Sequence, residues 1–315
     1  MKPGLAILAA LALVPAILLP ASLDYLLFPA TRILVFALAA ISLDLILGVG
    51  GLVSFGQAAF MGIGAYAIGI AASYGLTEGL LTIPLAMAAA ALFALATGAI
   101  ALRTTGVYFI MITLAFGQMA FFTASSLAPY GGDDGMTLPA RTTWLGWPGF
   151  DNRTILYYAA LLALALALLA LTRLARSRFG RVLRGASTAP RRIQSLGYDP
   201  YAHRLAAYTI AGALSGLAGA LLANATEFVS PAYMAWQRSG DLLIMVILGG
   251  AGSLYGAILG TIAYLALADL LAAWTEHWRI ILGPLLVLAV LSGPGGLARF
   301  RAPGWRAQAR KPKTR

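Results

Sequence analysis

Long runs of apolar residues, separated by short polar or charged segments, make up most of the chain. The longest runs carry no charged residue, and each reaches the roughly 18–20 residues that cross a bilayer as a helix. They are Leu45–Thr77, Gly79–Leu102, Thr104–Gly132, Thr154–Thr172, Leu205–Thr226, Leu242–Ala268 and Ile280–Ala298. A segment surrounded by lipid must satisfy its own backbone hydrogen bonds, which favours helix. The pattern therefore predicts an all-α polytopic integral membrane protein.

Basic residues gather in two clusters that flank apolar spans, one within residues 173–192 and one within residues 299–315. Lys and Arg are enriched on the cytoplasmic side of membrane proteins, so we expect both clusters to lie inside. An even number of spans must then separate them. We count four, at about 203–222, 236–250, 254–273 and 278–292.

Further spans precede the first cluster, at about 5–22, 31–48, 56–74, 80–102, 105–125 and 154–172. The total is about ten transmembrane helices, in a range of 8–10, with both termini in the cytoplasm. Glycine-rich stretches within 31–56 and 236–256 predict helices that are broken or re-entrant. Residues 1–22 resemble a signal peptide, but no clean Ala-x-Ala site follows, which favours a retained first span.

This threading predicts a single transmembrane domain over residues 1–298 and a basic cytoplasmic tail over residues 299–315. An external loop is expected at about 126–153 and a cytoplasmic loop at about 173–201. Glycines four residues apart lie on one helix face and allow helices to approach closely in lipid. On this basis we predict helix-packing roles for Gly212, Gly216, Gly252, Gly256 and Gly260.

Composition excludes several classes of site. The chain is 60% hydrophobic and 10% charged, and it has no cysteine and only two histidines. Disulfides and cysteine- or histidine-based metal sites are therefore not expected, and no metal or cofactor is predicted. The net charge of +11 comes largely from the two basic clusters, which indicates membrane orientation and contact with anionic lipid rather than nucleic-acid binding.

Catalytic motifs are also missing from the sequence. The lysines are Lys2, Lys311 and Lys313, and none follows a glycine-rich phosphate-binding loop, so the chain is not expected to hydrolyse ATP by that route or to be an enzyme. Acids in or near apolar segments, Asp44, Asp241 and Asp269, leave an ion-coupled secondary transporter as an alternative. They form no obvious relay along the sequence.

Five motifs follow one another between residues 45 and 297. They are "LGVGGLVSFGQAAFMGIGAYAIGI" at Leu47–Ile70, "LRTTGVYFIMITLAFGQM" at Leu102–Met119, "GGDDGMT" at Gly131–Thr137, "SRFGRVLRGAST" from Ser177, and "MVILGGAGSLYGAILG" from Met245. In this order they resemble the signature of permease subunits of branched-chain amino acid ABC importers. The Tyr-Phe and Phe-Gly-Arg stretches are closer to the LivM-type subunit than to its LivH-type partner.

The resemblance implies a permease of the bacterial cytoplasmic (inner) membrane that imports Leu, Ile or Val by alternating access. It implies as partners a second, LivH-like permease subunit, two ABC ATPase subunits and an external substrate-binding protein. Related permeases carry urea, short amides or aromatic compounds, so these substrates remain alternatives.

By the same resemblance, residues 177–197 include a coupling helix that docks on the ATPase and transmits its closure as rigid-body motion. The family often has an acidic stretch where this chain has "STAPRRIQS", which makes the loop more cationic. An alternative is that the arginines serve only to orient the chain. The residues assigned to coupling are Phe179 as apolar anchor, together with Gly180, Arg181, Arg184, Arg191, Arg192 and Gly197.

The substrate path is expected along the two glycine-rich stretches. Exposed backbone there, with a few hydroxyl and amide groups, offers hydrogen bonds to a zwitterionic substrate without fixed charge. Close helix packing is the alternative explanation of the same glycines. The residues assigned to the path are Gly48, Gly51, Ser54, Gln57, Gly249, Gly250 and Ser253.

Overall fold

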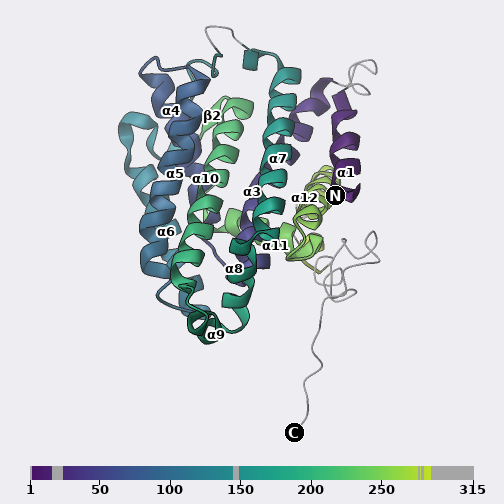
Figure 1. Ribbon diagram of the computed structural model, residues 1–315. Helices are drawn as coiled ribbons and strands as arrows, with labels where there is room; N and C mark the ends of the chain where they lie inside the picture. Colours follow the sequence, from purple (N-terminus) through teal and green to yellow (C-terminus); the bar gives the residue numbers. More distant parts are fainter. Residues whose placement is uncertain (1, 16–23, 145–148, 276, 278–279, 285–315) are drawn as a thin grey trace.

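A bundle of helices forms the protein in a computed structural model that describes residues 2–15, 24–144, 149–275, 277 and 280–284 (Figure 1). Its helices are α1 Lys2–Ala12, α3 Leu27–Asp44, α4 Gln57–Ser73, α5 Gly79–Ala101, α6 Val107–Ser126, α7 Arg153–Arg176, α8 Arg178–Thr188, α9 Pro190–Ser195, α10 Pro200–Thr226, α11 Trp236–Gly249 and α12 Leu254–Trp274. The strands β1 Met136–Thr137 and β2 Phe228–Val229 form one antiparallel pair. The expected all-α class therefore holds apart from this short pair.

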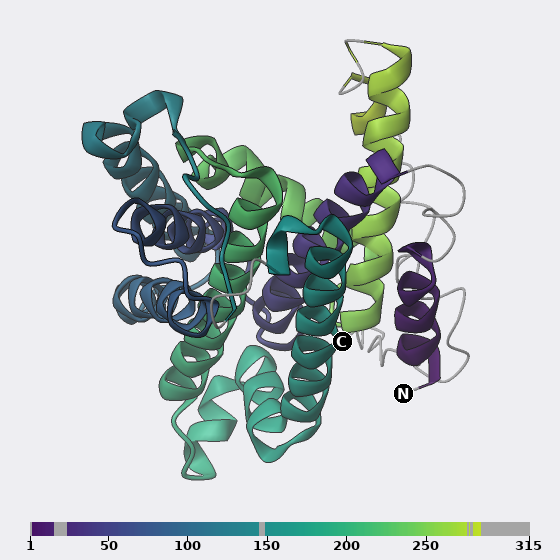
Figure 2. The same cartoon turned by 90° about the horizontal axis from the view of Figure 1, so that it is seen from above.

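Two helices form the centre of the bundle. α10 packs against α5, α4 and α3, and α3 in turn packs against α7 and α12. Viewed from above, α4, α5 and α6 lie on one side of this centre, and α7, α12 and α1 lie on the other (Figure 2). In the apolar stretch that includes α3, 78% of the residues are buried, against 28% in α5 and 22% in α6. The outer helices thus offer the apolar faces that a membrane protein presents to lipid or to other subunits.

Side-chain caps explain where several helices begin. The side-chain oxygen of Asn152 accepts a hydrogen bond from the Thr154 amide at the start of α7, at 2.9 Å. Asp199 caps α10 in the same way through the Tyr201 amide, also at 2.9 Å, and Pro200 occupies the first helical turn. Both arrangements satisfy amides that a helix leaves without partners at its N-terminus.

The two ends of the bundle differ in construction. At one end, α8 and α9 connect α7 to α10 and project from the bundle (Figure 1). At the other end three connections meet: β1 pairs with β2, and the bridge Glu78–Thr143 joins the α4–α5 connection to the α6–α7 connection. The long loop predicted at about 126–153 therefore lies at the end opposite the predicted cytoplasmic loop.

Within the described residues, fewer helices than the expected ten are long and apolar enough to span a membrane. In the described part of the chain, helices long and apolar enough to cross a membrane are Leu27–Val49, Gly79–Ala101, Val107–Ser126, Arg153–Arg176, Pro200–Thr226 and Leu254–Trp274. α4 is apolar but has 17 residues, and α11 has 14, fewer than the roughly 20 that a straight span requires. The glycine-rich stretches before α4 and after α11 account for this, because they end the helices early.

Some expected segments fall partly or wholly outside the described residues. The expected first span, 5–22, is described only up to residue 15, and most of the last, 278–292, is not described. The basic tail, 299–315, also lies outside the described residues. The count of ten spans therefore remains a prediction.

Glycines bring the central helices into close contact. A β-carbon on Gly212 would overlap the Ala94 side chain of α5, and one on Gly216 would overlap that of Ala90. On the other side of the bundle, Gly256 and Gly260 of α12 lie directly against the backbone of α11. Small residues at these positions permit the backbones to approach, as expected for helices in lipid.

The predicted helix-packing role is wrong for Gly252. It was expected to share a helix face with Gly256 and Gly260, but α12 begins only at Leu254. Gly252 lies in the preceding turn with φ +86°, a left-handed conformation that suits glycine. It therefore forms part of a break between two helices.

Candidate functional site

The first helix interruption follows α3. The helix continues into one π-helical turn, Leu45–Val49, and the chain is then non-helical until α4 begins at Gln57. The Gly50 amide donates to the Leu45 carbonyl oxygen at 3.1 Å, and Gly51 takes a positive φ of +67°. Glycine tolerates this geometry, so the sequence "GVGG" explains why the helix ends here.

The second interruption separates α11 from α12. Gly250 and Gly252 both have positive φ, +103° and +86°, and the Ser253 hydroxyl oxygen accepts a hydrogen bond from the Gly256 amide at 3.2 Å. Two left-handed glycines followed by a serine cap end one helix and start the next within four residues. The predicted breaks at both glycine-rich stretches are thus present.

The two interruptions meet inside the bundle. An oxygen of the Asp44 carboxylate accepts a hydrogen bond from the Gly252 amide at 2.7 Å, across 208 positions of sequence. A β-carbon on Gly48 would overlap the Gly252 backbone. The predicted path residue Gly48 therefore lies against Gly252, which stands between the path residues Gly250 and Ser253, while Gly249 ends α11.

Ser54 and Gln57, also assigned to the path, are fully buried within this chain. The Gln57 side-chain amide donates to the hydroxyl oxygens of Ser42 on α3 and Ser215 on α10, at 2.7 and 2.6 Å. Ser54 accepts from the Gly56 amide at 3.2 Å. These contacts join α3, α4 and α10, and neither residue lines the two cavities described below. Their role in a path stays a prediction.

The predicted coupling segment forms α8 and α9. One face of α8 is buried through Gly180, Val182, Leu183 and Ala186, and the opposite face exposes Arg181. Arg184 is also exposed but donates a hydrogen bond to the Ala175 carbonyl at the end of α7. An amphipathic helix of this kind fixes its orientation by its apolar face and leaves its basic face accessible.

Phe179 lies differently from the other assigned coupling residues. Its ring stacks on His203 of α10 with ring centroids 5.4 Å apart, and it packs against the core of this chain. The exposed apolar side chains near the tip are instead Leu196 and Tyr198, which lie beside the exposed Arg191 and Arg192. Gly197, between them, has φ +83°, and a β-carbon added to it would meet no atom within 4 Å.

The coupling segment also touches the first helix interruption. A β-carbon on Gly51 would lie 2.8 Å from the Ser187 β-carbon of α8. The guanidinium of Arg204 on α10 donates to the Ala186 carbonyl oxygen at 2.6 Å. α8 is therefore in contact with both α10 and the segment that leads to the Asp44–Gly252 contact.

Charged residues at the opposite end line two cavities that sequence reasoning did not assign. The larger, about 360 Å³, includes Arg32, Arg238, Asp241 and Asp269 among its lining residues. The smaller, about 280 Å³, includes Arg153. The sequence contains one signal that could have identified these residues. Arginines at the predicted external ends of spans are exceptions to the positive-inside bias, which marks them as candidate functional residues.

The acids considered for ion coupling each have a partner. Arg32 bonds both oxygens of Asp269, at 2.6 and 2.9 Å. Asp241 accepts from the Tyr264 hydroxyl at 2.7 Å and lies 3.7 Å from Arg238. Asp44 lies elsewhere, at the helix interruptions. The three acids thus serve separate contacts, with no direct link between them among the described residues.

Long apolar helices, paired interruptions within the bundle and a projecting basic segment define a multi-pass membrane protein of the transporter type. The family model described as "Branched-chain amino acid transport system / permease component" matches residues 25–290. The chain belongs to this permease family and is of the LivM type.

Similar proteins support both statements. The chain is 31% identical to the "High-affinity branched-chain amino acid transport system permease protein LivM" of Escherichia coli (strain K12), over 87% of this chain and 70% of that protein. It is 29% identical to the LivM protein of Salmonella typhimurium, over the same shares. The LivH protein of E. coli is 30% identical over only 42% of this chain and 44% of its own length. No solved structure matched the chain.

Proposed function

We propose that this chain is a permease subunit of an ATP-driven ABC importer that carries Leu, Ile and Val into the cytoplasm by alternating access. A LivH-like chain is its permease partner, two separate ATPase subunits supply the energy, and an external binding protein delivers the substrate. Both termini and the α8–α9 end lie in the cytoplasm of a bacterial cell. Family membership and the similarity to LivM proteins support the substrate class.

The observation that carries the coupling part of this proposal is the α8–α9 projection. It presents Arg191, Arg192 and Leu196 to solvent, which suits docking on another protein. Behind this surface, α8 packs on α7 and α10 and touches the Gly51 segment. A displacement of α8 by the ATPase therefore moves packed helices and the adjoining interruption as rigid bodies.

The substrate path in this proposal runs past the facing interruptions around Gly48 and Gly250. Backbone groups there are not committed to regular helix, and the Asp44–Gly252 hydrogen bond holds the two segments together. Broken helices near the middle of a transporter provide backbone ligands and allow local rearrangement. Because Ser54 and Gln57 are buried within the isolated chain, they line this path only when the helices around them rearrange during transport.

Reconstitution of the whole importer tests the proposal. Vesicles that contain both permease chains and both ATPase subunits should transport L-leucine only under two conditions. ATP must be present on the side of the membrane where the ATPase subunits lie, and the loaded binding protein must be present on the opposite side. A hydrolysis-deficient ATPase is the matched control and should abolish uptake. Uptake driven by a proton or sodium gradient without ATP would overturn the energy source, and uptake of urea or short amides in place of leucine would overturn the substrate.

A further inference from the structure

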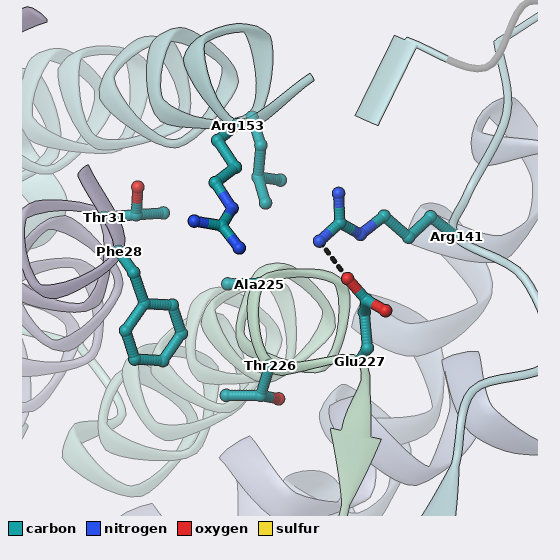
Figure 3. Close-up of a pocket in the computed structure, with 8 residues that line it drawn as sticks. Phe28, Thr31, Arg141, Arg153, Ala225, Thr226 and Glu227 are labelled. Carbon is teal, nitrogen blue, oxygen red and sulfur yellow. Dashed lines mark hydrogen bonds and ion pairs between the residues drawn. The ribbon is translucent and has the colours of Figure 1, made fainter. Parts of the chain in front are cut away.

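The smaller cavity lies at the end of the bundle opposite α8–α9, where α3 and α7 begin and α10 ends. Its volume of about 280 Å³ falls just below the range of roughly 300–1,000 Å³ for drug-sized ligands, so it suits a smaller molecule. Phe28 and Leu156 contribute apolar side chains to its lining, while Arg141, Arg153 and Glu227 contribute charged ones (Figure 3).

Arg141 is held firmly in place. One guanidinium nitrogen, Nη1, donates to the carbonyl oxygens of Phe150 and Asp151, each at 2.9 Å. The other, Nη2, donates to one carboxylate oxygen of Glu227. Only 12% of the Arg141 side chain is exposed, against 57% for Glu227. Arg141 therefore orients Glu227 and neutralises its charge, and within the described residues the second oxygen of that carboxylate has no donor.

Arg153 reaches into the same cavity from the first turn of α7, and its guanidinium faces the space beside Phe28 and Arg141 (Figure 3). Within the described residues it has no hydrogen bond and no ion pair. Two guanidinium groups and one carboxylate thus line the cavity, and no side chain of the described residues matches the charge of the exposed Arg153. A carboxylate is the natural partner for a guanidinium, because two parallel hydrogen bonds can form.

We propose that this cavity binds the zwitterionic group of an α-amino acid. Arg153 binds the carboxylate, the Glu227 carboxylate binds the ammonium group, and Phe28 and Leu156 contact the apolar side chain. The identity of the amino acid rests on the proposed function. A simple anion would match Arg153 but would leave the Glu227 carboxylate without a second cationic partner, and an apolar molecule would leave Arg153 unmatched.

The position of the larger cavity, next to the smaller one, supports the proposal that this binding site lies on the transport route. Phe28 and Thr226 line both cavities, so a ligand leaving the first one adjoins the second. The second extends between α3, α10, α11 and α12 to Met245 and Leu265. The proposed site is therefore an outer binding position from which the amino acid passes between these helices.

Equilibrium binding of radiolabelled L-leucine to the assembled importer in lipid nanodiscs, without binding protein, tests the site. We expect specific binding that Arg153→Gln weakens by roughly tenfold to a hundredfold, since it removes a charged hydrogen-bond partner. Arg153→Lys should keep part of the affinity. Leucinamide, which lacks the carboxylate, and 4-methylpentanoate, which lacks the ammonium group, should both compete poorly with L-leucine. Arg103→Gln, an exposed arginine outside both cavities, is the matched control and should bind as the wild type does.

Two outcomes overturn the site while leaving the proposed function intact. One is ATP-driven leucine uptake with leucine binding unchanged in Arg153→Gln. The other is a loss of affinity in Arg153→Gln for the ligand-free binding protein, which would show that the arginine meets an acidic side chain of that protein. Failure of the wild-type importer to take up leucine with all subunits and ATP present would instead overturn the proposed function.

Discussion

Single polar side chains in this apolar bundle connect interrupted backbone to neighbouring helices. The Ser239 hydroxyl oxygen of α11 accepts a hydrogen bond from the Ala58 amide at the start of α4, at 3.0 Å. Asp44 does the same for the Gly252 amide. Amides at the start of a helix have no partner within the helix, and lipid offers none, so another element must supply the acceptor. Each such residue fixes the position of a helix end.

Replacing Ser239 by alanine should destabilise the protein. The Ala58 amide would lose its acceptor in the interior, which we expect to cost about 0.5–2 kcal/mol, as for other helix caps. Thermal unfolding of the purified chain in detergent measures the effect. Ser73→Ala is the matched control because the Ser73 hydroxyl is exposed and bonds only within α4, to the Ile70 carbonyl. Equal unfolding temperatures for the two variants would contradict the capping role.

At the scale of helices and interruptions, glycine has two separate uses. In α10, Gly212, Gly216 and Gly219 let neighbouring helices approach. At the interruptions, Gly51, Gly250 and Gly252 adopt positive φ. Sequence spacing alone does not distinguish these two uses. Gly252 lies four residues before Gly256, as residues on one helix face do, but its positive φ means that it does not belong to a helix. The conformation is set by the Gly48 and Asp44 contacts across the bundle.

Gly219→Ala should lower stability although alanine favours helix. A β-carbon on Gly219 would overlap the Met61 carbonyl oxygen of α4, and forcing such an overlap typically costs about 1–3 kcal/mol. Gly240→Ala is the control, since its β-carbon would meet only the Phe55 ring, at 3.9 Å, and gains up to about 1 kcal/mol of helix propensity. Opposite shifts in unfolding temperature are expected. A rise in both variants would show that α4 and α10 are not packed this closely.

At the scale of the whole molecule, the two ends of the bundle carry different chemistry. One end presents the exposed arginines of α8–α9, and the other gathers three connections and two charged cavities. In the proposed importer, the first end would receive the energy input and the second would receive the substrate. Packing of α8 on α10 connects the ends, because α10 runs from Ala186 of α8 to the cavity at Thr226.

Single cysteines give the orientation directly, because the chain contains no native cysteine. We expect Gln194→Cys, exposed on α9, to react with a membrane-impermeant maleimide only in inside-out vesicles. Asp133→Cys, exposed at the opposite end, should react only in intact cells. Labelling of both positions from the same side would contradict the predicted transmembrane topology and would rule out α8–α9 as the docking site of the ATPase.

Charge reversal at the tip tests docking of the ATPase. The double variant Arg191→Glu with Arg192→Glu places negative charge where the docking surface is basic, and like-charge contacts at an interface cost several kcal/mol. Co-purification of the ATPase subunits and ATP-driven uptake should both fall by about tenfold or more. The charge-retaining control, Arg191→Lys with Arg192→Lys, should keep most of both. Full activity of the reversed variant would show that these arginines serve orientation alone.

The sequence by itself determined the helical class, the family and most helix positions. Expected spans such as 254–273, 105–125 and 80–102 lie within two residues of α12, α6 and α5, because uncharged runs between polar segments directly reflect the cost of charge in lipid. The breaks at the glycine-rich stretches also followed from local residue types. These properties depend on residues close together along the chain.

Only the tertiary structure decided which distant residues meet. The pairs Asp44 with Gly252, Ser239 with Ala58, and Arg141 with Glu227 join residues 86 to 208 positions apart. It likewise buried Ser54 and Gln57, turned Phe179 toward His203 and brought Arg153 into a shared cavity. Contacts of this kind depend on how whole helices pack against one another, and no local pattern of residues encodes that packing.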